Sequence, residues 1–195
     1  MTKRILLFAV LLGATASAAE AHIGVGGTAG FAHGFSHPFS GLDHLLAMVT
    51  VGLFAAKLGG RAWWLVPAAF LTMMAAGGAL GISGVGLPFV EIAIALSVIV
   101  LGTAVAVQWS LPLSAAMALA GFFAVFHGHA HGAEMPVSAS GLSYALGFIS
   151  ATASLQAIGI GLGIALLAKA YSHRLAQLGG GAMALAGLGI LTGVL

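Results

Sequence analysis

The chain contains no cysteine, and only 5% of its 195 residues carry a charge. The absence of cysteine excludes disulfides, thiolate metal sites and CxxC redox chemistry, which leaves His, Asp, Glu, Met and the backbone as possible metal ligands. Charge this scarce excludes a soluble domain of this size, because such a domain needs charged residues to cover its surface. With 61% hydrophobic residues, the composition predicts an all-α membrane protein with the lipid bilayer as its solvent.

Two further absences limit the function. The net charge is only +2, without a basic stripe, which argues against a nucleic acid partner. No Gly-Lys pair occurs, so the chain cannot contain a phosphate-binding P-loop. We expect no resident cofactor. The oligomeric state stays open, and a homo-oligomer is one of the alternatives.

The N-terminal segment has the pattern of a secretory signal peptide. Lys3 and Arg4 precede a short apolar stretch at 5–12, and small residues follow up to position 21. An uncleaved first membrane helix is the alternative, but the apolar stretch is short for a span of ~20 residues. We therefore predict a cleavable signal peptide over residues 1–21. Cleavage would leave His22 as the terminal residue, whose amine and imidazole could chelate a metal ion.

Six apolar stretches follow the signal peptide, and each approaches the ~20 residues that a membrane-spanning helix needs. They cover residues 39–56, 62–81, 87–107, 113–126, 142–168 and 178–195. The fifth is long enough to be tilted or broken. The sequence thus predicts that residues 22–195 form one transmembrane domain, a bundle of six transmembrane helices.

The distribution of Lys and Arg predicts the orientation of this bundle. Lys57, Arg61, Lys169 and Arg174 all fall in alternate loops on one side, which the positive-inside rule assigns to the cytoplasm. Both histidine clusters then lie at the outer face. We expect a multi-pass protein of the bacterial inner membrane whose mature N-terminus is periplasmic.

The second histidine cluster lies at the end of the fourth stretch. His127, His131 and Glu134 stand at i, i+4 and i+7, which places them on one stripe of a helix, while His129 points to the other side. Gly128 and Gly132 would let a neighbouring helix pack close beside this stripe, and a proline soon after should end the helix. Imidazoles with a carboxylate suit borderline divalent metals. The alternative is that the histidines only cap a helix end.

The first cluster opens the first stretch. Pro38 suits the first turn of a helix, so the span should begin at His37 or Pro38. In a straight helix His37 and His44 share a face but lie roughly 10 Å apart, too far to bind one ion. Either the helix start is irregular or there are two metal stations. Three alternatives stay open for Asp43. It could bind the metal directly, orient an imidazole by accepting its N–H, or act as a negative charge at the helix N-terminus.

Four more residues are possible members of a metal path. Glu91 could be a ligand, a proton carrier or a first-turn helix charge, and Gln156 could line the path or form an interhelical hydrogen bond. His33 and His22 could collect metal before delivery or could be surface residues without a function.

At the two clusters the sequence resembles the HupE/UreJ family of nickel and cobalt permeases, known from hydrogenase and urease gene neighbourhoods. His37-Pro38-x-x-Gly41-x-Asp43-His44 looks like its first signature, and Phe126-His127-Gly128-x-Ala130-His131-Gly132-x-Glu134 looks like its second. The resemblance implies a secondary permease that imports Ni²⁺ or Co²⁺, with functional residues His37, Asp43, His44, His127, His131 and Glu134. Many members have a Leu-His pair where this chain has Leu155-Gln156, a departure that bears on the identity of the metal.

Two other functions are compatible with the same residues. A metal-binding membrane accessory protein would pass ions to a partner during maturation of a metalloenzyme such as urease or hydrogenase, without transporting them. An intramembrane metalloenzyme would use His and Glu at helical spacing to activate water. Metal flux through the protein distinguishes the permease from both.

Overall fold

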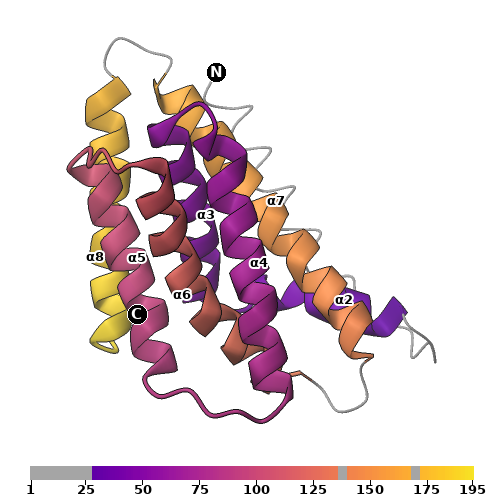
Figure 1. The fold of residues 1–195 in the computed structure, drawn as a ribbon. Coiled ribbons are helices and arrows are strands. Elements are labelled where there is room, and N and C mark those ends of the chain that lie inside the picture. The colour runs from indigo at the N-terminus through magenta and orange to yellow at the C-terminus, as the bar shows by residue number, and fades with distance from the viewer. Residues whose placement is uncertain (1–27, 136–139, 168–171) are drawn as a thin grey trace, which may run out of the picture.

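The computed structural model describes residues 28–135, 140–167 and 172–195, in which helices are the only regular elements (Figure 1). The predicted signal peptide and His22 lie outside the described residues. In chain order the helices are α2 (Thr28–Ser36), the short 3₁₀ helix η1 (His37–Phe39), α3 (Leu42–Leu58), α4 (Ala62–Ile82), α5 (Val90–Ala106), α6 (Leu113–Ala133), α7 (Gly141–Leu167) and α8 (Ser172–Leu191).

Each of the six predicted apolar stretches overlaps one of the helices α3 to α8, and the chain is a multi-pass membrane protein. Four helices are long and apolar enough to cross a bilayer, namely Ala62–Ile82, Leu113–Ala133, Gly141–Leu166 and Arg174–Leu191. A fifth span results if Gly30–Phe39 and Leu42–Leu58 are counted together, and Val90–Ala106 is a shorter apolar helix. A count of six spans therefore stays a prediction.

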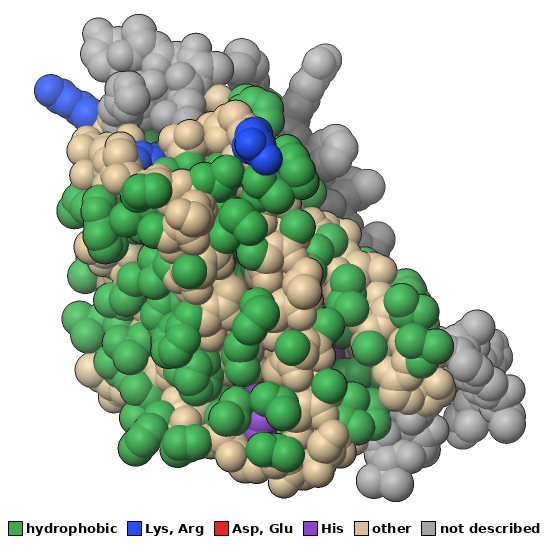
Figure 2. All heavy atoms as spheres, viewed as in Figure 1, with side chains coloured by type: hydrophobic (Ala, Val, Ile, Leu, Met, Phe, Trp, Pro, Cys, Tyr) green, Lys and Arg blue, Asp and Glu red, His purple; other side chains and the backbone are tan. Residues whose placement is uncertain are grey.

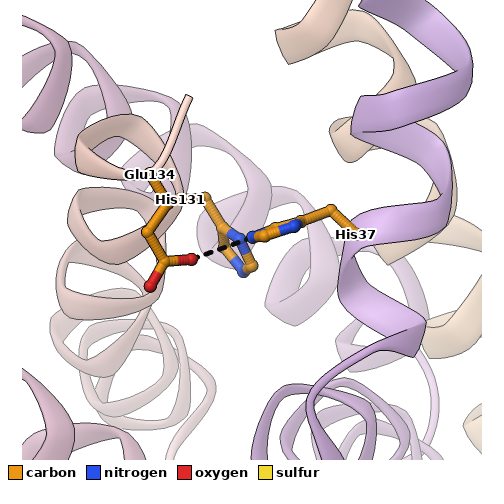
Figure 3. Close-up of side chains that lie close together, drawn as sticks. All are labelled: His37, His131 and Glu134. Atoms are coloured by element: carbon orange, nitrogen blue, oxygen red, sulfur yellow. Dashed lines mark hydrogen bonds and ion pairs between the residues drawn. The ribbon is translucent and has the colours of Figure 1, made fainter. Parts of the chain in front are cut away.

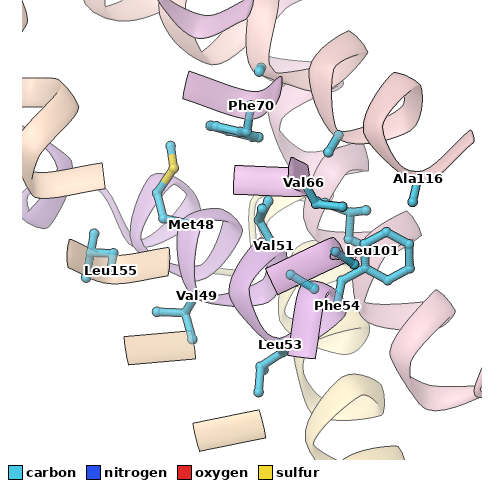
Figure 4. Close-up of a cluster of buried hydrophobic side chains, with 14 of the residues drawn as sticks. Met48, Val49, Val51, Leu53, Phe54, Val66, Phe70, Leu101, Ala116 and Leu155 are labelled. Atoms are coloured by element: carbon cyan, nitrogen blue, oxygen red, sulfur yellow. The ribbon is translucent and has the colours of Figure 1, made fainter. Parts of the chain in front are cut away.

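Helix α3 lies at the centre of the bundle. Every residue from Ala47 to Ala56 is buried, as expected for a helix that is apolar on all sides. Its neighbours are α4, α5, α7 and, with fewer contacts, α8 and α6, while α4 packs along α6 and α5 along α8. Figure 4 shows the resulting core, in which Met48, Val51 and Phe54 of α3 meet side chains from α4, α5, α6 and α7. The core fixes α3 relative to α6, the two helices on which most candidate ligands lie.

Glycines bring α4 and α6 into backbone contact. A Cβ added at Gly128 would overlap the carbonyl oxygen of Met74, and one at Gly132 would overlap that of Gly78. Small residues permit such close approach between membrane helices, where packing drives association. The prediction that a neighbouring helix packs close beside the ligand stripe is confirmed, and that helix is α4.

The first span does not begin as a continuous helix at His37 or Pro38, contrary to that prediction. Pro38 lies in η1, Gly41 is extended at φ −108° and ψ 124°, and α3 starts at Leu42. The segment before this break is bent by 81° relative to α3. The bend is stabilised by α2, which packs against α7. The sequence does not reveal this contact, because Pro38 also fits the first turn of an ordinary helix.

Other boundaries differ less. Helix α6 continues beyond the apolar stretch at 113–126 through the histidines and ends at Ala133. Helix α5 begins at Val90, after Phe89 adopts a left-handed conformation with φ 60°, so the helix is shorter than the stretch at 87–107. Helix α7 is continuous over its 27 residues, and thus the fifth stretch is not broken.

The described charges separate between the two ends of the bundle. Lys57 lies in the last turn of α3, Arg61 precedes α4, and Arg174 lies near the start of α8. Figure 2 shows the blue Lys and Arg side chains of this face at one end of the molecule. Asp43 and Glu134, at the start of α3 and the end of α6, lie at the opposite end.

Candidate metal centre

The two histidine clusters meet at the end of the bundle opposite the Lys and Arg side chains. Because the chain bends between η1 and α3, His37 and His44 approach His131 of α6 from two directions. The ring centroids of His37 and His131 lie 4.7 Å apart, and those of His44 and His131 lie 4.2 Å apart. The helix start is irregular, as one of the two alternatives drawn from the sequence expected.

His37, His131 and Glu134 form the part of the site nearest to the surface. Nε2 of His37 donates a hydrogen bond to Oε2 of Glu134 over 3.0 Å, and Figure 3 shows His131 beside this bond. Each of the three residues offers one ligand atom, and these atoms all lie within 4.8 Å of one another. An imidazole, a second imidazole and a carboxylate at this spacing could bind one divalent ion.

Exposure is highest at the two surface residues of this group and low at the histidines behind them. The side chain of Glu134 is 58% exposed and that of His37 is 28% exposed. His131 is only 3% exposed, and His127 is fully buried. His44, also buried, lies between them, with its ring centroid 5.0 Å from that of His127. By their ring contacts, four imidazoles form a row that begins at the partly exposed His37 and ends at the fully buried His127, in the order His37, His131, His44 and His127.

Asp43 orients the third imidazole of the row. Its Oδ1 accepts hydrogen bonds from the backbone N–H of His44 over 2.8 Å and from Nδ1 of the same residue over 2.9 Å. Since a carboxylate only accepts, the imidazole proton is on Nδ1, and Nε2 of neutral His44 has a free lone pair. This geometry matches the alternative in which Asp43 orients an imidazole. Asp43 also lies in the first turn of α3.

Several nitrogens in the row have no hydrogen-bond partner among the described residues. They are Nε2 of His44, Nδ1 of His127 and both ring nitrogens of His131, and all are buried. Buried polar atoms are nearly always paired, because an unpaired one loses its interaction with water without compensation. A metal ion that visits these nitrogens would supply the missing partner.

The structure places the other predicted residues outside the three-residue group. His129 donates from Nε2 to the carbonyl oxygen of Val85 over 2.6 Å, which ties α6 to the loop before α5. His33 and Glu91 are exposed. Gln156 is buried in α7, and within the described part of the chain neither atom of its amide has a partner.

Two residues near the row were not identified from the sequence. Ser97 of α5 is buried with its Oγ 2.9 Å from Nε2 of His127. Tyr144 of α7 has its ring centroid 6.0 Å from that of His37, and it lines a cavity of about 240 Å³ together with His131. A serine in an apolar span and a tyrosine near a helix end carry no local signal, so only the packing of α5 and α7 reveals them.

A family model and a curated protein each match most of the chain. The family described as HupE / UreJ protein matches residues 9–190. The curated protein named Protein HupE, from Rhizobium leguminosarum bv. viciae, is 49% identical over 177 residues, which cover 91% of this chain and 92% of that protein. No solved structure matches the chain. The family match over most of the chain and this degree of identity show that the protein belongs to the HupE/UreJ family.

Proposed function

We propose that the protein is a secondary permease that imports a divalent transition-metal ion, Ni²⁺ or Co²⁺, across the bacterial inner membrane. The family is generally associated with nickel and cobalt transport. The observation that carries the proposal is the row of four imidazoles, which leads from an exposed carboxylate to a fully buried histidine. Ionisable groups at membrane depth are costly and by default indicate an ion path.

Capture begins at Glu134, His37 and His131. In the metal-free protein a proton on Nε2 of His37 bridges to Glu134. When a dication that has lost part of its water binds here, the proton of His37 moves to Nδ1, so the ring stays neutral and its Nε2 lone pair and the carboxylate of Glu134 are both available as ligands. The negative charge of Glu134 at the surface also attracts the cation before it is bound.

The ion then moves inward along the row. The ring centroids of consecutive imidazoles are 4.7, 4.2 and 5.0 Å apart, so each step transfers the ion between neighbouring rings. The ring of His131 contacts those of both His37 and His44, and neither of its nitrogens is tied to another described group. His131 is therefore the residue that links the capture group to the buried part of the path.

We further propose the orientation and the processing of the chain. The end with Lys57, Arg61 and Arg174 faces the cytoplasm under the positive-inside rule, and the histidine row opens to the periplasm. Residues 1–21 are removed as a signal peptide, and helices α3 to α8 form six spans. The metal is cargo in this proposal, and the protein is not an enzyme. The donor set suits Ni²⁺ and Co²⁺ alike, because selection between them depends on geometry rather than ligand type.

Uptake of radioactive nickel and cobalt into lipid vesicles that contain only the purified protein tests the proposal. We expect time-dependent uptake with the wild type, and loss of uptake with His131→Ala, because this change interrupts the row. His33→Ala is the matched control, since it removes an exposed histidine that lies outside the group.

Each rival function predicts a different result in this experiment. Stoichiometric metal binding to the purified protein without accumulation inside the vesicles would contradict the permease and favour an accessory protein. Zinc content with hydrolytic activity that Glu134→Gln abolishes would favour a metalloenzyme. Equal uptake by the wild type and His131→Ala would refute the proposed path.

A further inference from the structure

Ser97 is a buried hydroxyl on α5 that contacts the innermost histidine of the row. It is 0% exposed, as is His127. Its Oγ lies 2.6 Å from the carbonyl oxygen of Ile94 in the same helix and 2.9 Å from Nε2 of His127. Ser97 thus connects a helix that supplies none of the capture group to the buried end of the path.

The two contacts of Ser97 determine where its proton is. A hydroxyl has one proton, and a carbonyl oxygen can only accept a hydrogen bond. At 2.6 Å the contact with Ile94 is a short O–H···O bond, so the hydroxyl proton is shared with Ile94. The reverse arrangement would hold two oxygen acceptors together without a proton between them. The lone pair of Oγ therefore faces His127.

This arrangement fixes the tautomer of His127. Because Oγ of Ser97 accepts, Nε2 of His127 must donate, and a neutral imidazole has only one N–H. The lone pair of His127 is then on Nδ1, which is buried with no partner in the described part of the chain. By the same logic Asp43 leaves the lone pair of His44 on Nε2. The two neighbouring rings, perpendicular at 90°, each have one free lone pair.

We propose that Ser97 is a positioning residue for transport, because it keeps the proton of His127 on Nε2 and so leaves Nδ1 free to receive the ion from His44. This inference rests on the proposed function. Ser97 touches the histidine and not the ion, in the same way that Asp43 acts on His44. Mutation of a group that orients a metal-binding histidine typically lowers metal affinity or activity by about 10–100-fold. Without Ser97, His127 can place its proton on either nitrogen, and one tautomer blocks the transfer.

The first measurement concerns the tautomer itself and needs no metal. Nitrogen NMR of ¹⁵N-histidine-labelled full-length protein, with His127 assigned by its loss in His127→Ala, distinguishes a protonated from an unprotonated ring nitrogen. We expect protonated Nε2 and bare Nδ1 in the wild type, and a mixture of tautomers in Ser97→Ala. A wild-type His127 with its proton on Nδ1 would overturn the inference.

The second measurement separates positioning from structural damage. In vesicles, Ser97→Ala should lower the maximal rate of nickel or cobalt uptake by about 10–100-fold without raising KM, because the capture group is unchanged. Ser97→Thr, which keeps the hydroxyl, should restore most of the rate. The matched control is Thr50→Val, since Thr50 is also buried and donates to a helix carbonyl, that of Leu46 over 2.6 Å. Thr50→Val should transport normally.

Three outcomes would overturn the role of Ser97, namely a wild-type rate in Ser97→Ala, an equal loss in Thr50→Val, or a higher KM with an unchanged maximal rate. If Ser97→Thr folds but does not transport, Ser97→Cys is tested in its place. If neither variant restores the uptake rate, the side chain of Ser97 does not act as the hydrogen-bond donor and acceptor proposed here. Absence of uptake by the wild type would refute the proposed function instead, and the NMR result would then decide the tautomer inference alone.

Discussion

Replacement of Gly128 by alanine should separate α6 from α4 and weaken both the fold and transport. The Cβ of alanine would overlap the carbonyl oxygen of Met74. A backbone carbonyl within a helix cannot rotate away as a side chain can. The two helices must therefore move apart by about 1 Å or more to restore an ordinary contact of roughly 3.5 Å.

The size of the effect follows from two opposing contributions. Overpacking of a close helix contact costs about 1–3 kcal/mol, whereas alanine in place of glycine stabilises a helix by up to about 1 kcal/mol. Gly121→Ala on the same helix isolates the first contribution. The nearest neighbour of a Cβ at Gly121 is the flexible side chain of Met73, at 3.0 Å, and the carbonyl oxygen of Ala69 lies at an ordinary contact distance of 3.8 Å. We expect Gly128→Ala to be less stable than Gly121→Ala by about 1–3 kcal/mol.

The same displacement affects the metal path. His127 and His131 flank Gly128 on α6, while His44 lies on α3, so the shift changes their mutual distances. Binding groups tolerate displacements of only about 0.5 Å, and a shift of about 1 Å can lower a rate up to a hundredfold. Unfolding in mixed micelles and uptake per folded molecule are the two assays. If Gly128→Ala matches Gly121→Ala in both, the close contact does not position the histidines.

Three further predictions concern single side chains. Glu134→Gln should raise KM for nickel uptake by about tenfold, since it removes the charge that pairs with the cation but keeps the shape; an unchanged KM would exclude Glu134 from capture. Asp43→Ala should reduce the uptake rate by about 10–100-fold and Asp43→Asn by less, because the amide oxygen still accepts from Nδ1 of His44; equal activity of Asp43→Ala and the wild type would refute the orienting role. His129→Ala should destabilise the fold by about 1 kcal/mol through loss of the bond to Val85 but leave uptake per folded molecule unchanged, and a selective loss of uptake would place His129 on the path.

Local patterns in the sequence predicted much of the site. The i, i+4, i+7 spacing of His127, His131 and Glu134 predicted one helical stripe, and the structure places all three at the end of α6. Gly128 and Gly132 predicted close packing of a second helix, which α4 supplies. These predictions hold because helix periodicity and small-residue packing depend on neighbours within one or two turns.

The remaining features depend on contacts between distant segments. The sequence left an irregular helix start as one of two alternatives and could not decide for it, because the break near Gly41 depends on the packing of α2 against α7. A Cβ at Gly34 of α2 would overlap the carbonyl oxygen of Tyr144, and one at Gly147 of α7 would overlap that of Phe31. Ser97 likewise acquires its place beside His127 only when α5 and α6 pack together.

The bend before α3 explains how a short motif can serve two positions on one path. In a straight helix, His37 and His44 would lie roughly 10 Å apart on the same face, and no single imidazole could contact both. With the chain bent by 81°, the first histidine lies near the surface with Glu134 and the second lies inside the bundle with Asp43. His131 fits between them, 4.7 and 4.2 Å from their ring centroids. Gly41, extended and without a side chain, lies at the break between these two positions.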